Sequence, residues 1–395
     1  MASEADRVSE SSSPTAGGRR ADLLPVVAWS SIAAVLLLLQ FFARYRSRGT
    51  IRPLDGWVQF DGPEYLSIAT RGYTPRQLVW FPTYPTVLGW VDRVVADPVL
   101  AGVVVSATCG LAATVLFWRW TRTMDVPERS RRVALLVLLL YPYGWFLYGV
   151  VYSDALFLAF ALLAFLSVER GRVWLAAAAG AVATATRPSG LAVTIGLCVL
   201  SLERAGVLYV PGPEAGWAHR LRLPVCVDLR LLRWRHVVPG LSVLGLVGYM
   251  TYLWVRWDNP IRFVSEQSRY HDSGSGTLLK QQYFDAWYSG ADGRHLATTT
   301  AQAVLLMVVL GSVAAVGRRY GWGYGAFVFC LALLPMVSVS TFMGSGRYLL
   351  PAFPCFVLAG EWLASRRAAQ IAWFTLSGAA LLVMAFGFSR SWYLT

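Results

Sequence analysis

Twenty consecutive residues near the start of the chain, LLPVVAWSSIAAVLLLLQFF from Leu23 to Phe42, carry no charged side chain. This length matches the roughly 20 residues that a helix needs to cross about 30 Å of hydrocarbon. The run is too long for the apolar part of a signal peptide, and the FARYRSRG that follows has no A-x-A cleavage pattern. We therefore expect an uncleaved first span, preceded by residues 1–22 as a disordered cytoplasmic tail rich in Ser, Glu and Gly.

Similar apolar blocks recur along the chain, which is 56% hydrophobic and only 14% charged and so lies outside the usual soluble range. The sequence predicts an all-α polytopic membrane protein with about 11 transmembrane helices. After the first span, the others are expected near Pro98–Trp120, Val133–Val150, Ala155–Val168, Val173–Thr186, Leu191–Leu202, Val237–Val255, Thr298–Val316, Trp322–Thr341, Tyr348–Leu363 and Ile371–Phe388.

The topology depends on two short neighbouring blocks, Val173–Thr186 and Leu191–Leu202, which are separated by Arg187-Pro188-Ser189-Gly190. They form either one interrupted helix or two helices that meet at a turn. Two helices place most of the arginine-rich loops on one side of the membrane, whereas one helix would send the later clusters to the other side. The positive-inside rule therefore favours two helices and a cytoplasmic N-terminus, although the arginines of residues 44–52 are an exception.

The basic charge does not indicate a nucleic-acid partner. The formal net charge is +13, but the arginines lie in short loops between apolar blocks, as expected of a protein whose partners include membrane lipids. The five cysteines show neither CxxC nor metal-ligand spacing. The sequence also lacks a G-x-G-x-x-G, a P-loop and a D-x-D motif, which argues against a nucleotide-sugar domain. No cofactor is expected, and a metal requirement stays open.

The predicted topology brings four charged residues from separate segments to one membrane face, the non-cytoplasmic one: Asp61, Asp154, Arg187 and Arg347. Acids and guanidinium groups gathered at one face suit an anionic lipid head group. Asp61 and Glu64 stand three residues apart and would share a face on a helical turn. The pair is either a solvated acid pair on a loop or includes a general base, Asp61, near the membrane surface.

Four motifs in order give the chain a resemblance to a known family. They are D-x-x-x-Y-L-x-I-A-x-x-G-Y from Asp61 followed by F-P-x-Y-P from Phe81, Y-S-D-A-L-F from Tyr152, A-T-R-P-S-G from Ala185, and R-Y-L-L-P followed by F-P from Arg347. This pattern resembles the PIG-V family, the GPI mannosyltransferase II proteins and their bacterial relatives, which have the GT-C membrane glycosyltransferase architecture. The chain departs from the family at Phe60, where Trp is usual, at Glu64, where His is frequent, and at Asp154, where Glu is usual.

The resemblance implies transfer of mannose from a polyprenyl-phosphate donor to a lipid-linked or cell-surface glycan acceptor, outside the cytoplasm, at a bacterial plasma membrane. It implies a GT-C-like domain over residues 23–390, with a catalytic extracytoplasmic loop 43–97, a second external loop 257–297 and a cytoplasmic loop 203–236. Asp61 is then the catalytic base. The implied substrate-binding residues are Glu64, Tyr65, Tyr84, Asp154, Arg187 and Arg347.

The chemistry of these residue types fits this assignment. A sugar phosphate already has a good leaving group, so transfer needs a carboxylate to accept the proton of the acceptor hydroxyl and cations to hold the phosphate. Guanidinium groups match phosphate oxygens in geometry, which suits Arg187 and Arg347.

Alternative roles stay open for each residue. Asp154 can cap a helix, Arg187 can reach from a helix end to the membrane surface, and Arg347 can flank an apolar span. Three alternative functions are the same fold acting on a polyprenyl-phosphate arabinose or glucose, a polytopic lipid or sugar transporter, and a non-catalytic assembly subunit. The absence of an internal repeat argues against the transporter.

Overall fold

The computed structural model describes residues 16–45, 53–212, 223, 226–270, 280–290, 293–338 and 340–392. In the first half of the chain these form α1 (Ala16–Tyr45), η1 (Pro53–Trp57), α2 (Gly62–Arg71), η2 (Pro75–Val79), α3 (Thr83–Val95), α4 (Pro98–Thr123), α5 (Glu128–Leu139), η3 (Gly144–Leu147), α6 (Asp154–Glu169), α7 (Val173–Thr184) and α8 (Gly190–Arg204), where η denotes a 3₁₀ helix. The remainder forms β1 (Leu208–Tyr209), β2 (Cys226–Val227), η5 (Leu229–Leu231), α10 (Trp234–Val237), η6 (Val238–Val243), α11 (Leu244–Trp257), α12 (Arg262–Tyr270), α13 (Gln281–Tyr288), α14 (Gly293–Tyr320), α15 (Trp322–Ser338), α16 (Ser345–Tyr348), α17 (Phe353–Ala364) and α18 (Arg367–Ser389).

Five stretches of the described residues are long and apolar enough to cross a membrane: Leu23–Ala43, Pro98–Thr123, Trp234–Trp257, Leu296–Tyr320 and Arg367–Ser389. The chain is accordingly a helical integral membrane protein. The prediction of about 11 spans is not confirmed, because the other apolar blocks form shorter helices. At 1.5 Å per residue, a 12-residue helix such as α7 is roughly 18 Å long, well short of the hydrocarbon thickness.

Two of the expected spans are broken by proline. The block Val133–Val150 is not one helix, because α5 ends at Leu139, before Tyr141-Pro142, and the chain continues as the short helix η3. The block Tyr348–Leu363 is likewise divided at Pro351, with α16 before it and α17 after it. A proline lacks the backbone N–H and restricts the residue before it, so each block is interrupted by a turn at its proline. Such non-helical backbone is tolerated at membrane depth only where it is packed inside the protein.

The expected disordered tail, residues 1–22, lies outside the described residues as far as residue 15, and α1 already begins at Ala16. The expected loop 43–97 contains, where it is described, η1, α2, η2 and α3 but no spanning helix. Residues 46–52 of that loop, residues 271–279 and 291–292 of the loop 257–297, and residues 213–222 and 224–225 of the loop 203–236 lie outside the described residues.

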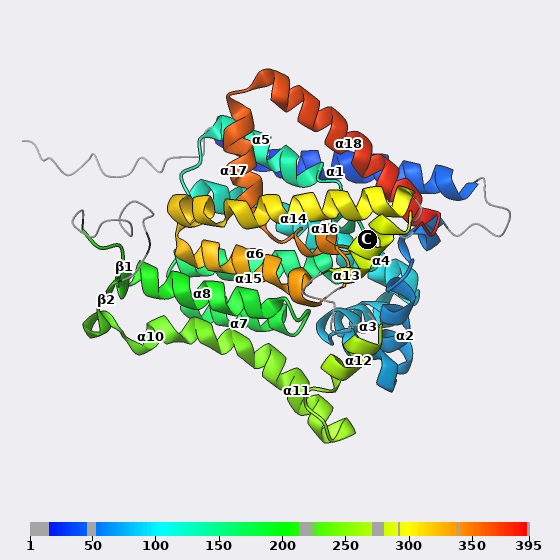
Figure 1. Cartoon of the computed structure of the whole chain (residues 1–395), viewed down its shortest axis with the longest axis horizontal. Helices are drawn as coiled ribbons and strands as arrows, with labels where there is room; N and C mark the ends of the chain where they lie inside the picture. Colours follow the sequence, from blue (N-terminus) through cyan, green and yellow to red (C-terminus); the bar gives the residue numbers. More distant parts are fainter. Residues whose placement is uncertain are drawn as a thin grey trace, which may run out of the picture.

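The central element is α6, which is apolar on all its faces, as expected of a helix surrounded by protein. Thirteen of its 16 residues are buried, and it packs against α4, α7 and α8. Figure 1 shows α14, α15, α8 and α7 lying side by side, with α2, α3 and α12 gathered toward one end of the bundle. The first residue of α6, Asp154, is fully buried. This helix therefore delivers a carboxylate to one end of the bundle.

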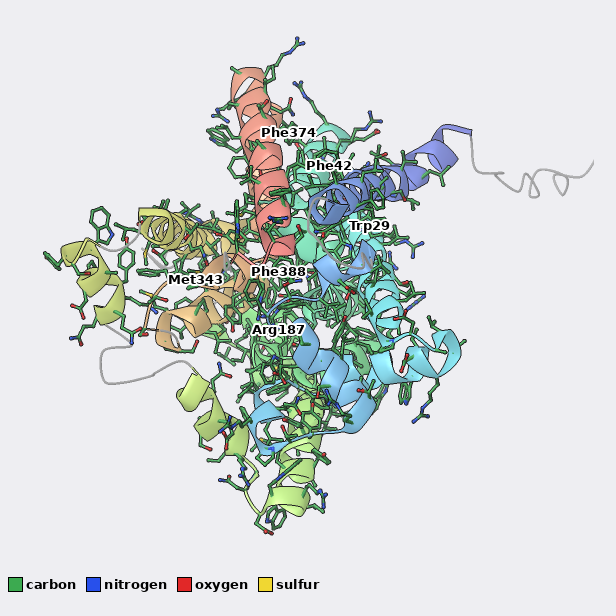
Figure 2. The ribbon with its side chains drawn as sticks, turned by 90° about the vertical axis from the view of Figure 1, so that its right-hand side faces the viewer. Trp29, Phe42, Arg187, Met343, Phe374 and Phe388 are labelled. Atoms are coloured by element: carbon green, nitrogen blue, oxygen red, sulfur yellow. The ribbon has the colours of Figure 1, made fainter. Side chains whose placement is uncertain are left out.

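The turn between α7 and α8 confirms that the two short blocks are separate helices. Pro188 cannot continue a helix, so the chain turns at Arg187 and starts α8 at Gly190. The two helices meet closely there, because a Cβ on Gly190 would lie only 2.4 Å from Cα of Thr184. Seen from this end of the bundle, Arg187 lies near the middle of the molecule (Figure 2).

Candidate active site

Asp61 immediately precedes α2 and is held by two other parts of the chain. Its backbone N–H donates a hydrogen bond to the hydroxyl of Tyr152, at 3.0 Å. The preceding residue, Phe60, has φ of +52°, a left-handed conformation that is uncommon for a bulky side chain, and its ring lies 5.5 Å from that of Phe388 in α18. The backbone of Asp61 is thus held in place, while its side chain is 31% exposed and its carboxylate is accessible.

Asp154 and Arg187 form a buried ion pair between the start of α6 and the α7–α8 turn. The Arg187 guanidinium donates to Oδ1 of Asp154, and the two side chains are 6% and 1% exposed. The guanidinium also lies over the rings of Phe157 and Tyr348, at 5.9 and 5.1 Å from their centres. A buried charge is tolerated only when it is paired, and Asp154 supplies the counter-charge of Arg187 here.

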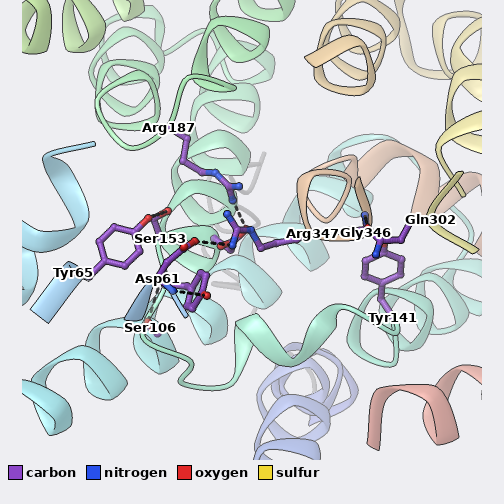
Figure 3. A network of polar contacts seen from close by, with 11 residues as sticks. Asp61, Tyr65, Ser106, Tyr141, Ser153, Arg187, Gln302, Gly346 and Arg347 are labelled. Carbon is purple, nitrogen blue, oxygen red and sulfur yellow. Dashed lines mark hydrogen bonds and ion pairs between the residues drawn. The ribbon is translucent and has the colours of Figure 1, made fainter. Parts of the chain in front are cut away.

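Arg347 in α16 joins this pair to Asp61. Its Nη1 donates to Oδ2 of Asp61 at 3.0 Å, and its Nε lies 3.7 Å from Oδ1 of Asp154. Burial lowers the pKa of Arg347, but the charges of Asp154 and Asp61 outweigh this and leave the pKa well above its ordinary value. The guanidinium therefore stays charged, and it also lies 5.0 Å from the ring centre of Tyr152. The structure thus brings together Asp61, Asp154, Arg187 and Arg347, the four residues that the predicted topology gathers (Figure 3).

Three buried polar atoms of this cluster have no hydrogen-bond partner among the residues that the structure describes. They are Oδ2 of Asp154, Nη2 of Arg187 and Nε of Arg347. An unpaired polar atom in the protein interior costs free energy, and here three such atoms belong to charged side chains within one cluster. Two donors and one acceptor held beside an accessible carboxylate are suited to a polar, anionic ligand.

The backbone next to Arg347 is fixed on both sides of Gly346. The N–H of Gly346 donates to Oε1 of Gln302 in α14 at 3.1 Å, and its carbonyl accepts from the hydroxyl of Tyr141 at 2.8 Å. A Cβ at this position would lie 2.2 Å from the Tyr143 ring. Both hydrogen-bonding side chains are buried, so Gln302 and Tyr141 set where the Arg347 backbone lies.

Replacing Gly346 by alanine is expected to destabilise the protein by about 1–3 kcal/mol, because an added methyl group in a packed core forces its neighbours apart. The measurement is thermal unfolding of the purified protein in detergent. Gly378→Ala in α18 is the matched control, because nothing lies within 4 Å of a Cβ there. Equal unfolding temperatures for the two variants would contradict the close contact with Tyr143.

The remaining predicted residues lie around the cluster with different environments. The Tyr65 hydroxyl is 3.0 Å from Oγ of Ser153, and burial together with the charge of Asp61 raises the pKa of Tyr65, so its phenol stays neutral. Tyr84 is fully buried, and its hydroxyl lies 2.7 Å from Oγ of Ser106, a hydrogen bond that joins α3 to α4. Tyr65 and Tyr84 contact each other edge to face, with ring centres 4.9 Å apart.

The carboxylate of Glu64 binds a different partner from the carboxylate of Asp61. Its Oε2 accepts a hydrogen bond from Nε2 of Gln77 at 2.7 Å, and among the described residues no ion pair joins it to Arg187 or Arg347. Asp61 has helical backbone angles (φ −72°, ψ −18°), and its carbonyl accepts from the N–H groups of Glu64 and Tyr65. The two acids therefore lie on one helical turn, although their carboxylates bind different partners. A substrate contact of Glu64 stays a prediction.

The sequence predictions missed Tyr152, Gln302 and Gly346. Tyr152 is the first residue of the Y-S-D-A-L-F motif, two residues before Asp154, so the motif itself is the signal that could have identified it as a site residue. Gln302 is a polar residue within an apolar spanning helix, and a fully buried amide in such a helix usually has a specific partner. Gly346 gave no such signal, because its role depends on tertiary contacts alone.

No family model and no curated protein matches the sequence, so the resemblance to the PIG-V family rests on its four motifs alone. Solved structures of an oligosaccharyltransferase from the archaeon Archaeoglobus fulgidus are similar to the chain. One is tethered to an acceptor peptide and shows 11% identity and a TM-score of 0.47, over 93% of this chain and 55% of that one. A second holds zinc and sulfate, with 11% identity and a TM-score of 0.45, over 92% and 53%.

A third is the oligosaccharyltransferase AglB of the same organism with an inhibitory peptide and a dolichol-phosphate, at 10% identity and a TM-score of 0.42, over 92% of this chain and 56% of that one. The chain thus spans about half the length of these structures. The chain is a helical membrane protein with a four-residue charged cluster, Asp61, Asp154, Arg187 and Arg347, at one end of its bundle.

Proposed function

We propose that the protein is a membrane glycosyltransferase of the GT-C type, related to the PIG-V family. It moves mannose from a polyprenyl-phosphate donor to a lipid-linked or cell-surface acceptor on the extracytoplasmic face. The observation that carries this proposal is the buried Asp154–Arg187–Arg347 cluster, with its unpaired donors, in contact with the accessible carboxylate of Asp61.

The donor's phosphate is bound by Arg187 and Arg347. Nη2 of Arg187 and Nε of Arg347 are buried donors with free hydrogen-bonding capacity, and a guanidinium fork matches two phosphate oxygens. Asp154 holds both guanidiniums in place, because its Oδ1 is the common contact of the pair. Asp154 is therefore a positioning residue in this proposal, and its neighbours Arg187 and Arg347 touch the substrate.

Asp61 takes the proton of the acceptor hydroxyl. As the acceptor oxygen forms its bond to the anomeric carbon, the bond from that carbon to the phosphate oxygen breaks, and the phosphate leaves with the electron pair. The two arginines stabilise the charge that develops on the leaving phosphate. Because Arg347 contacts Asp61 at 3.0 Å, the same guanidinium places the phosphate beside the base.

The proposal is tested with the purified protein in lipid nanodiscs and a labelled polyprenyl-phosphate mannose, with a membrane lipid extract as acceptor. Label is expected to move from the donor to an acceptor product. Donors that carry arabinose or glucose are run in parallel, and a product from one of those alone would replace mannose by that sugar. A second assay uses proteoliposomes. If labelled substrate crosses their membrane unchanged and no donor gives a product, the proposal that the protein is an enzyme is contradicted and a transporter is indicated.

A further inference from the structure

A second surface with both charged and apolar side chains lies at the opposite end of the bundle from Arg187. It consists of the stretch from Asp228 to Val237, which contains η5 and α10, together with Arg170, Arg172 and Trp174 at the α6–α7 turn. We refer to it as the distal surface. The two parts are joined by the rings of Trp174 and Trp234, whose centres are 6.1 Å apart. Figure 1 shows β1, β2 and α10 at the left-hand end, away from α2 and α3.

The apolar side chains of the distal surface are not covered by other parts of the protein that the structure describes. Leu229 and Trp234 are 69% and 68% exposed, and the neighbouring apolar positions are exposed as well: Leu231, Leu232, Val237 and Trp174. A contiguous apolar patch of this kind is unfavourable in water and marks a contact surface.

The backbone of the distal surface before α10 is not suited to hydrocarbon. From residue 228 to residue 233 it contains only the three-residue helix η5, and the strand β2 before it pairs with β1 over only two residues, so this part lacks a regular hydrogen-bond pattern. Lipid-exposed backbone of this kind does not occur at the depth of the acyl chains. The head-group layer accepts both features, because it hydrates the backbone and covers the leucines and tryptophans.

The charge of the distal surface selects the kind of lipid. The arginines of the surface, Arg170, Arg172, Arg230, Arg233 and Arg235, are all exposed. The nearby acids are engaged elsewhere, since Asp228 accepts from the backbone N–H of Arg230 and Glu169 accepts from Arg204. Clusters of arginine beside a spanning helix attract anionic lipids. The stretch leads directly into such a helix, since the candidate span Trp234–Trp257 begins within it.

We propose that the distal surface binds the phosphate groups of anionic phospholipids at the membrane boundary opposite to the charged cluster. Arg230, Arg233 and Arg235 contact the lipid phosphates, while Leu229, Leu231 and Trp234 enter the boundary between head groups and acyl chains. This site is independent of the proposed glycosyl transfer.

The test reconstitutes the full chain in a mixture of phosphatidylglycerol and phosphatidylcholine, and native mass spectrometry counts the lipids retained. The wild-type protein is expected to retain phosphatidylglycerol in preference to phosphatidylcholine, and added salt is expected to weaken this preference. The triple variant Arg230→Gln, Arg233→Gln, Arg235→Gln is expected to lower it about a hundredfold, since each of the three arginines near an anionic surface contributes roughly fivefold.

The matched control removes the same charge from other exposed sites at that end of the bundle: Arg129→Gln, Arg318→Gln and Arg367→Gln. This control is expected to keep most of the preference, as is a triple lysine variant at Arg230, Arg233 and Arg235. If the two glutamine variants lose the preference equally, only the general charge matters and the distal surface is not a site. A wild-type protein that retains both lipids equally would overturn the proposal without any variant, and would leave the surface to an acidic protein partner.

Discussion

Asp61→Asn is expected to lower the rate of sugar transfer by about 10²–10⁴-fold, the usual contribution of a general base, while the protein still folds. Asparagine keeps the shape of the side chain but cannot take a proton. It also releases Arg347 from the contact at 3.0 Å, so binding of the donor phosphate is not expected to weaken. The rate of product formation and the affinity for a labelled polyprenyl phosphate are measured on the same preparation.

Glu64→Gln is the matched control for Asp61→Asn. The two acids stand three residues apart, but Glu64 is hydrogen-bonded to Gln77 and lies outside the charged cluster. This control is expected to keep transfer within about tenfold of the wild-type rate, since uncharged glutamine still fills the same space. If Asp61→Asn retained comparable transfer, Asp61 would not be the base. Equal losses in both variants would indicate a general electrostatic effect of the loop.

Asp154→Asn is expected to destabilise the protein by about 3–5 kcal/mol, because it leaves the buried guanidinium of Arg187 without a counter-charge. Both side chains are almost completely buried, so water cannot replace the lost partner. Thermal unfolding in detergent measures the effect. The double variant Asp154→Asn, Arg187→Gln removes both charges and is expected to recover at least half of the loss, with the Asp61–Arg347 contact left in place.

The exposed pair Glu128–Arg132 provides the control for this stability prediction. Its side chains are 51% and 60% exposed and lie one helical turn apart. Glu128→Gln is expected to change stability by about 0.5 kcal/mol or less, as is usual for exposed pairs. If Asp154→Asn were no more destabilising than Glu128→Gln, the Asp154–Arg187 pair would not be held in a water-excluded site.

The convergence of the charged residues could be predicted because it follows from topology. Pro188 prevents one continuous helix and marks a turn, and the charge bias of the loops then indicates which helix ends share a membrane face. Those two local rules placed Arg187 and Asp154, which are 33 residues apart in the sequence, on the same membrane face, and the fold brings them into direct contact. The number of spans could not be predicted in this way, because hydropathy does not distinguish a spanning helix from a short helix buried inside the protein.

The geometry around Arg347 could not be predicted from the sequence, for a different reason. The position of Gly346 depends on its hydrogen bonds with Gln302 in α14 and with Tyr141 in the turn after α5, and neither contact has a local sequence signature. The hydrogen bond between Glu64 and Gln77 also has no local signature, because helical spacing gives the turn that Glu64 shares with Asp61 but not the partner of each carboxylate. Such features depend on which surfaces pack together, and only the folded chain contains that information.

The burial of α6 has a consequence for the behaviour of the protein in membranes of different thickness. Peripheral helices such as α1 and α18 expose apolar side chains and can tilt when the bilayer thins or thickens. α6 is enclosed by other helices along nearly its whole length, so the annular lipids exert little direct force on it. The carboxylate at its tip should keep its position relative to the two guanidiniums across lipid compositions, so the geometry of the charged cluster is expected to change little with the thickness of the bilayer.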